Sequence, residues 1–291
     1  MKKLTAFWLS CLFIIFTQPA FAELTPALWQ VEKQGKTSYL FGTVHVGDTS
    51  MKGLPQKIEK AISNSDAVVV EVDLTALTAV QIQQRSMPFL MLQNGRTLDS
   101  ELSPQSYQKL DQYFGEKNIN IKMFSLLKPW AVLLTMMQIE LQNAGYSDEF
   151  GIDKQVLASA KQKNKAIIEL ESLEQQMEMF TVLEEHSDLM VADTFRQLNQ
   201  FDKSFLRLIN GWKKGETAVL TEAYEQSFDD SEYGQLNEHV LLIERNHKWV
   251  KQLEKPLSEQ SLFIAVGALH LGEENGLIKL LQAQGFKVSR I

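Results

Sequence analysis

The chain has 291 residues, a length that fits one large domain or two modest ones. Hydrophobic residues make up 44% of the sequence and charged residues 22%, and this composition excludes collagen-like, coiled-coil and disordered proteins. The formal net charge of −7 argues against nucleic acid as the main partner, because binding to phosphates requires a basic surface.

Residues 1–22 have the pattern of a secretory signal peptide. Two lysines precede an apolar segment over residues 6–16, and a small-x-small cleavage site follows at residues 20–22. The apolar segment is too short to cross about 30 Å of hydrocarbon comfortably, which favours cleavage over a membrane anchor. We therefore expect an exported protein, periplasmic or secreted, that starts at Glu23 and has no membrane span. The only cysteine, Cys11, would leave with the signal peptide, so the mature chain could form no disulfide.

The first part of the mature chain predicts two strands, a helix and a third strand. Apolar residues at 28–31 and 38–41 flank a polar turn, which is typical of two short paired strands. Pro55 predicts the first position of a helix, where proline is favoured. The β-branched segment 67–72 predicts a strand that is buried on both faces, as in a parallel sheet.

Later segments repeat this alternation of strands and helices. Ile152, Val156, Leu157 and Ala160 share one face of a predicted helix. The remaining predictions are a second buried strand at 165–170, a strand at 261–266, an amphipathic helix at 276–284 and a strand at 286–291.

The order of these elements predicts an α/β fold with a mixed, mainly parallel sheet, flanking helices and a large helical insertion. One domain over residues 23–291 would follow the signal peptide. We expect mainly helical insertions at about 75–164 and 173–256 within this domain.

Two similar motifs each place a histidine just after an apolar strand. They run from Gly42 to His45 and from Gly267 to His270, and both read Gly-x-x-His. Glycine at a strand end lets the backbone turn sharply or approach a ligand closely. Because ligands bind at the carboxyl edge of open α/β sheets, the two histidines are candidate site residues. Two ordinary loop histidines remain the alternative.

Glu71 strengthens the case for a site, because it ends a buried strand, where a carboxylate needs a cation or a strong donor. Two neutral imidazoles and one carboxylate form a well-attested set of ligands for a divalent metal ion. Asp73 would share the face of Glu71 if the strand continued. A structural ion pair between Glu71 and a lysine or arginine is the alternative.

These motifs, in this order, resemble the TraB/GumN family, relatives of the Tiki proteases, with wider kinship to erythromycin-esterase-like and ChaN-like domains. The resemblance covers nearly all of the mature chain. It rests on Gly42-Thr43-Val44-His45, Val69-Val70-Glu71-Val72-Asp73, Glu149-Phe150-Gly151-Ile152-Asp153, Glu169-Leu170-Glu171 with Gln175, Glu244-Arg245-Asn246 with Trp249, and Val266-Gly267-Ala268-Leu269-His270-Leu271.

The resemblance implies a metal-dependent hydrolase, peptidase-like by analogy with the Tiki branch. His45, His270 and Glu71 match the family's functional positions. The metal would be Mn(II) or Co(II) by resemblance, and the chemistry of two histidines and a carboxylate equally allows Zn(II). Glu71 would act as third ligand or as general base, and the substrate would be a peptide or another small molecule.

Two further residues have open roles. Arg245 would clamp a substrate carboxylate or oxyanion, or else form a salt bridge to the core domain. Glu171 would orient a ligand or act as a base, or else form a structural ion pair.

Two alternative functions stay open at this point. One is a metal-free hydrolase in which His45 is the general base. The other is a non-enzymatic protein that binds haem or sequesters a peptide. The oligomeric state is also left open by the sequence.

Overall fold

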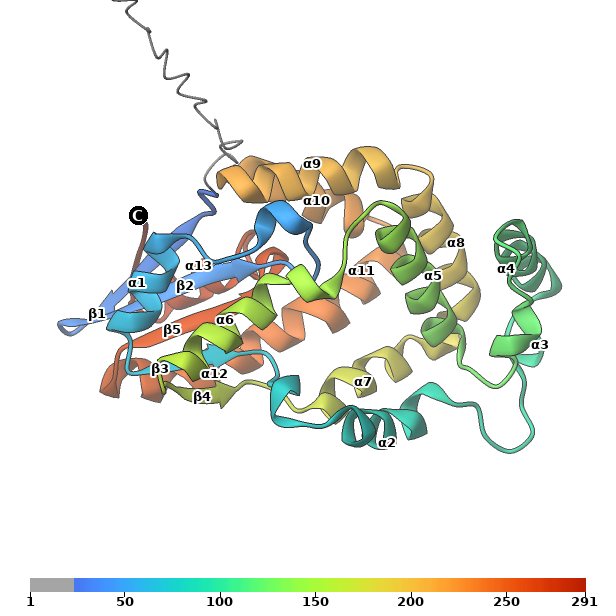
Figure 1. Ribbon diagram of the computed structural model, residues 1–291, viewed down its shortest axis with the longest axis horizontal. Helices are drawn as coiled ribbons and strands as arrows, with labels where there is room; N and C mark the ends of the chain where they lie inside the picture. The colour runs from blue at the N-terminus through green and yellow to red at the C-terminus, as the bar shows by residue number, and fades with distance from the viewer. Residues whose placement is uncertain (1–23) are drawn as a thin grey trace, which may run out of the picture.

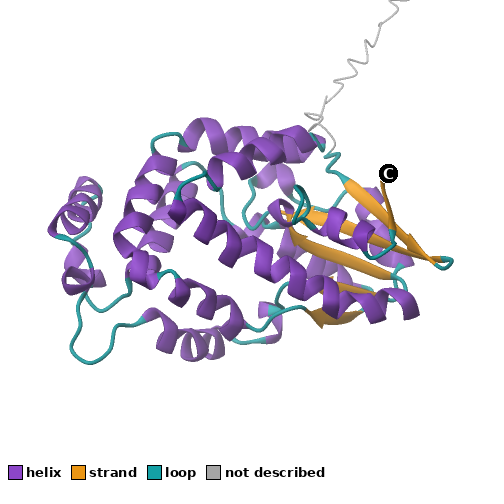
Figure 2. Ribbon diagram, turned by 180° about the vertical axis from the view of Figure 1, so that it is seen from behind, coloured by secondary structure: helices purple, strands orange, loops and turns teal. Residues whose placement is uncertain are grey.

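The computed structural model describes residues 24–291, so the predicted signal peptide over 1–22 lies outside the described residues. A six-stranded sheet lies at one end of the molecule, with helices on both of its faces, and further helices extend beyond its edge (Figures 1 and 2). The strands are β1 (Leu28–Lys33), β2 (Lys36–Thr43), β3 (Ala67–Val70), β4 (Ala166–Glu169), β5 (Leu262–Gly267) and β6 (Lys287–Arg290).

The sheet is mixed and mainly parallel, as the sequence predicts. The strand order is β4-β3-β5-β2-β1-β6, and the pairs β4–β3, β3–β5 and β5–β2 are parallel. Strand β1 pairs antiparallel with both β2 and β6. The carboxyl ends of four neighbouring strands therefore meet at one edge of the sheet, the edge at which α/β proteins bind ligands.

Most of the chain is helical, and the helices form two groups, those that cover the sheet and those that lie beyond it (Figure 1). The α-helices are α1 (Gln56–Asn64), α2 (Ala79–Leu90), α3 (Leu98–Glu101), α4 (Pro104–Glu116), α5 (Pro129–Asn143), α6 (Ile152–Gln162), α7 (Leu173–Val182), α8 (Ser187–Leu198), α9 (Phe201–Lys214), α10 (Thr217–Ser227), α11 (Glu232–Glu238), α12 (Glu244–Glu259) and α13 (Leu277–Ala283). None of the helices within residues 24–291 is long and apolar enough to cross a membrane.

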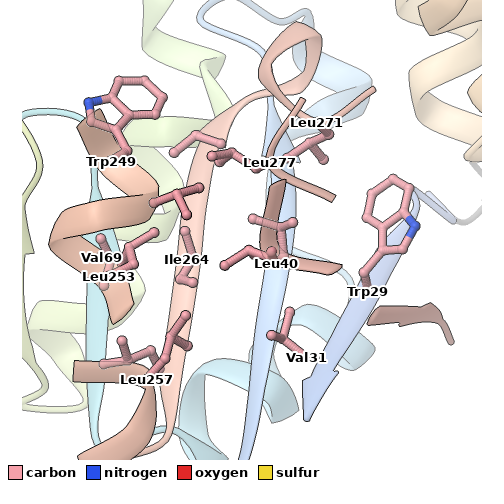
Figure 3. Close-up of a cluster of buried hydrophobic side chains, with 14 of the residues drawn as sticks. Trp29, Val31, Leu40, Val69, Trp249, Leu253, Leu257, Ile264, Leu271 and Leu277 are labelled. Atoms are coloured by element: carbon pink, nitrogen blue, oxygen red, sulfur yellow. The ribbon is translucent and has the colours of Figure 1, made fainter. Parts of the chain in front are cut away.

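Alternating side chains of the central strands supply two hydrophobic layers, because successive residues of a strand point to opposite faces. On one face, Val69 and Ile264 pack with Trp249 and Leu253 of α12 (Figure 3). On the other face, residues of β3 and β5 pack against α1, α6 and α9. The sheet is therefore buried on both sides, as its β-branched strands predict.

The predicted helix at 152–160 is confirmed, since α6 buries all four residues that were assigned to one face. Two predictions need correction. Pro55 is the N-cap of α1 and not its first residue. The segment 165–170 forms β4, but this strand lies at the edge of the sheet and is only half-buried, because β3 is its one neighbour in the sheet.

The helices beyond the sheet form a helical lobe, which comprises residues 79–143, 173–198 and 232–243 and has its own apolar core. In this core the rings of Trp130 and Phe180 stack with their centroids 4.8 Å apart. A π-helix over His239–Ile243 joins α11 to α12, so one continuous helical rod runs from the lobe to the sheet. This rod carries Arg245 past the carboxyl edge of the sheet.

Candidate functional site

The site is built at the carboxyl ends of four neighbouring parallel strands. Glu171 follows β4, Glu71 follows β3, His270 follows β5 and His45 follows β2. Segments that are far apart in the sequence thus supply side chains to one edge. The structure brings together both Gly-x-x-His motifs and Glu71, as the sequence analysis expected.

Gly267 marks the point at which these side chains converge. A Cβ atom at this position would lie 3.3 Å from Oε1 of Glu71, 3.5 Å from Cδ2 of His270 and 4.0 Å from Nε2 of His45. Any side chain here would fill the space among them. Gly42 has a packing role instead, because a Cβ atom there would lie only 2.9 Å from the Cα atom of Ala268.

Glu71 is buried and held entirely by donors. The N–H of Gly267 donates to Oε1 over 2.7 Å, and the Arg245 guanidinium donates to Oε2 over 2.6 Å. Gln176 of α7 donates to Oε2 over 3.3 Å. Burial alone would raise the pKa of this carboxyl, but the positive charges of Arg245 and of protonated His45, with the Gly267 N–H, hold the pKa of Glu71 below its usual range. Glu71 is therefore ionised at neutral pH.

Arg245 uses every N–H group of its guanidinium within the protein. Its Nε donates to Glu171 over 3.0 Å, and its Nη2 donates to both Glu71 (2.6 Å) and Glu171 (3.0 Å). Its Nη1 donates to the carbonyl of Leu241 (2.9 Å) and to Nε2 of His270 (3.1 Å). A guanidinium has five N–H donors, so none is left for a substrate oxyanion in this arrangement. Of the two roles that the sequence left open, the structure shows the salt bridge.

Glu171 likewise forms a structural ion pair, since its carboxylate accepts from Arg245. It also accepts from the indole N–H of Trp249 over 3.1 Å. The guanidinium also lies over the Trp249 ring, 4.6 Å from its centroid. We refer to Glu71, Glu171, Arg245 and His270 as the buried cluster.

His270 is neutral and presents Nε2 to this cluster. Its Nδ1 lies 2.6 Å from Oδ1 of Asn246, whose own Nδ2 donates to the carbonyl of Asn275 over 2.8 Å. An amide oxygen only accepts, so Nδ1 carries the proton, and the lone pair of Nε2 accepts from Nη1 of Arg245. Burial lowers the pKa of His270 to about 3.

His45 differs from His270 in both exposure and charge. Its side chain is 73% exposed, and its Nδ1 lies 3.0 Å from Oδ2 of Asp153. Thr43 donates to the other oxygen of Asp153 and so fixes the carboxylate. The Asp153 charge raises the pKa of His45 to about 9, so this imidazole is protonated at neutral pH.

Asp73 does not belong to the site, and the expectation for it is corrected. Strand β3 ends at Val70, and the chain then turns into a 3-10 helix over Leu74–Ala76. Asp73 caps that turn by accepting from the N–H of Thr75 and lies 3.3 Å from Lys161. Because the strand stops before Glu71, the alternation that would place both carboxylates on one face no longer applies.

Sequence reasoning gave no site role to several residues that orient the site. Asp153 holds His45, Asn246 holds His270, and Trp249 and Gln176 hold the two glutamates. The first three were noticed only as parts of motifs. Their roles depend on helices α6, α7 and α12 reaching the strand ends, which no local pattern predicts.

The residue types of the donor set suit a divalent cation, but their spacing in this arrangement does not. Both histidines have Nδ1 held by an oxygen acceptor, as metal-binding histidines do, and Nε2 of His45 would lie 4.0 Å from a Cβ atom at Gly267. Across residues 24–291 no group of three His, Cys, Asp or Glu side chains is close enough to hold a metal ion. The Nη1 group of Arg245 donates to Nε2 of His270 over 3.1 Å. A cation could bind His270 only if that contact were released.

Taken together, the fold and the site define an α/β protein with histidines and carboxylates at the carboxyl edge of a mainly parallel sheet. The chain belongs to the TraB/PrgY/gumN family, whose model matches residues 27–290. This confirms the resemblance that the motifs indicate.

Relatives of the chain include two bacterial proteins, each described as "Uncharacterized protein YbaP". The one from Shigella flexneri is 28% identical over 249 residues, which are 84% of this chain and 88% of the relative. The one from Escherichia coli (strain K12) is 28% identical over 248 residues, which are 84% of this chain and 87% of the relative. No solved structure matches the chain.

Proposed function

We propose that the protein is an exported, metal-dependent hydrolase that cleaves peptide-like substrates. The observation that carries the proposal is the charge of the site. Glu71, Glu171 and Asp153 are three carboxylates, whereas Arg245 is one permanent cation. With His270 neutral, the balance depends on His45. The site carries one excess negative charge when His45 is protonated and two when it is not.

The excess of Glu71 and Glu171 over Arg245 is buried, and a buried excess charge is costly unless a counter-charge is present. A divalent cation would balance the two negative charges of the state in which His45 has lost its proton. The same loss of the proton frees Nε2 of His45 as a ligand, because Nδ1 faces Asp153. Charge balance and the release of a ligand atom on His45 thus support the same occupant.

His45, His270 and Glu71 would hold the cation. When bound, it would polarise a substrate carbonyl and lower the pKa of a water molecule toward about 7. The side chains of Asp153 and Asn246 would keep both imidazoles oriented through their Nδ1 atoms. Arg245 and Glu171 would fix Glu71 from the opposite side. Resemblance to the Tiki branch favours Mn(II) or Co(II).

A metal-free hydrolase is the second candidate, and the His45–Asp153 pair favours it. An imidazole that is oriented by a carboxylate is the usual arrangement of a general acid–base group. Because Asp153 raises the pKa of His45 to about 9, this group would enter the reaction as a general acid at neutral pH. Loss of the metal would leave such an activity intact.

The deciding experiment is metal analysis of the protein purified from the exported fraction without chelators. It is combined with hydrolysis of a defined peptide panel in the presence of Mn(II), Co(II) or Zn(II). We expect one divalent ion per chain, loss of turnover with EDTA, and recovery with Mn(II) or Co(II). Turnover that persists in EDTA would favour the metal-free hydrolase. A Soret band on haem titration, without any turnover, would favour a binding protein.

Single substitutions provide the control for this experiment. His45→Ala and His270→Ala should each abolish metal binding, while His247→Ala, at an exposed position of α12, should not. Metal content that is unchanged in both site variants would refute the proposed ligand set.

A further inference from the structure

A pocket adjoins the buried cluster, between α7 and the π-helix that leads into α12. Glu171 and Arg245 line it on the side of the cluster, and Met179, Val182 and Val240 form its apolar part. The other lining residues are polar or charged: Gln175, Glu178, Glu244 and Lys248. The pocket has a volume of about 220 Å³. Val182 is 56% exposed, so the pocket can be reached from solvent at that residue.

The size of the pocket limits what it can hold. Complete small-molecule sites measure about 300–1,000 Å³. A pocket of 220 Å³ is therefore suited to one part of a larger ligand. The apolar part of the pocket, formed by Met179, Val182 and Val240, suits an aliphatic side chain, and the charged residues around it can face solvent or the polar backbone of a peptide. Met179 can adapt to different shapes because a methionine side chain is flexible.

The π-helix connects this pocket to the site. The N–H of Glu244 bonds to the carbonyl of His239, five residues earlier, which is the mark of a π turn. Such turns occur most often at functional sites. Here the turn supplies Val240 to the pocket and the carbonyl of Leu241 to Nη1 of Arg245, over 2.9 Å. A ligand in the pocket would thus lie against the turn that anchors Arg245.

Helix α7 makes a second connection. Its residues Gln175 and Met179 line the pocket, and Gln176 between them donates to Oε2 of Glu71 over 3.3 Å. Arg245 lines the pocket and donates to the same oxygen over 2.6 Å. The pocket is therefore separated from Glu71 by one layer of side chains, a spacing that suits neighbouring parts of one substrate.

We propose that this pocket is a specificity subsite that binds an aliphatic side chain, of the size of leucine or methionine, next to the bond that is cleaved. The proposal rests on the proposed function, because it assumes a peptide-like substrate. Its test is therefore made first by binding, which needs no turnover.

The binding test follows the methyl group of Met179 by NMR in protein labelled at methionine methyl carbons. The probes are two terminally blocked tripeptides, Ala-Leu-Ala and Ala-Gly-Ala, and a Met179→Leu variant assigns the resonance. We expect a saturable shift with Ala-Leu-Ala and a roughly 10- to 100-fold weaker affinity for Ala-Gly-Ala, which is the typical effect of burying a leucine side chain. No shift with the leucine peptide, or equal affinities, would overturn the proposal.

A matched pair of variants locates the binding. Val182→Trp should fill the pocket and remove the shift, and it should fold normally because Val182 is exposed. Val80→Trp, on α2 and 60% exposed, introduces the same residue away from the pocket and should bind as the wild type does. Wild-type binding by Val182→Trp would exclude this pocket.

Turnover then separates the two proposals. If the leucine peptide binds but no peptide is cleaved, the subsite stands and the hydrolase proposal fails. If peptides are cleaved at rates that do not depend on the side chain, the hydrolase proposal stands and the subsite is refuted.

Discussion

Replacing Glu71 with glutamine keeps the volume of the side chain and removes one charge, and the contacts of Glu71 show what this would cost. Oε1 accepts from the N–H of Gly267, and Oε2 accepts from Arg245 and Gln176. Each neighbour is a donor. The NH₂ group of a glutamine must therefore face another donor, whichever way the amide is turned.

The less costly orientation directs the amide oxygen at Arg245 and leaves the N–H of Gly267 without its acceptor. A buried donor that loses its partner costs about 1–3 kcal/mol. The loss of a complete buried ion pair would cost about 3–5 kcal/mol, but Arg245 keeps Glu171 as a partner, so the lower range applies. For a domain of about 150–250 residues, each kcal/mol lowers the melting temperature by about 2–4 °C. We expect Glu71→Gln to melt about 2–12 °C below the wild type.

The functional result distinguishes the roles of Glu71. As a ligand, its loss should remove both metal and turnover, whereas as a general base its loss should leave the metal and lower kcat by roughly 10²–10⁴. Metal content, peptide hydrolysis and thermal unfolding by circular dichroism measure these effects. Asp73→Asn is the matched control, because Asp73 is a buried carboxylate near the same strand end that faces away from the site. A fully active, metal-replete Glu71→Gln protein would refute the mechanism.

Three other predictions follow from the site and from the signal peptide that the sequence predicts. His270→Ala should unfold more easily than His45→Ala in denaturant titration, because His270 is buried against Trp249 whereas His45 is exposed, although both should lose metal. The Asp153→Asn change should lower the pKa of His45, measured by NMR, from about 9 toward 6.5. In the wild type the pKa of His45 is higher in the folded chain than in the unfolded chain, so the His45–Asp153 contact stabilises the fold fully below pH 6.5, and this stabilisation is lost as the pH rises through 9. The mature chain should begin at Glu23, and an intact mass that matches all 291 residues would contradict cleavage.

The central strands could be predicted from the sequence because their local pattern is decisive. The apolar segments that form β3 and β5 can bury all of their side chains only at the centre of a sheet, where both faces are covered. Strand β4 shows the limit of this argument. Its isoleucines resemble those of a central strand, but its place at the edge depends on the strand order, which is set by contacts between distant segments. The π turn before α12 likewise has no local signal that we could identify.

The core of the site was also predictable, because parallel strands bring their carboxyl ends together. His45, Glu71 and His270 each follow such a strand, so they lie at the same edge of the sheet whatever the order of the strands, and the order β3-β5-β2 then makes them neighbours. The prediction for Asp73 was wrong, because it assumed that β3 continues past Val70. Asp153 and Asn246 received no role, since both lie on helices whose approach to the sheet depends on tertiary packing.

Exposure divides the site into a fixed part and an accessible part. The side chains of Glu71, Arg245 and His270 are 9%, 12% and 5% exposed, whereas that of His45 is 73% exposed. Arg245 has all of its donors engaged, so an incoming ligand gains no contact there without breaking an existing one. A cation or substrate therefore meets His45 first, and the buried cluster responds to it only when His45 gives up its proton or Arg245 leaves His270. If the proposed function holds, the proton on His45 and the Arg245–His270 contact would be the two barriers to loading this site. Asp153 holds the first, and Glu71, Glu171 and the carbonyl of Leu241 hold the guanidinium that makes the second.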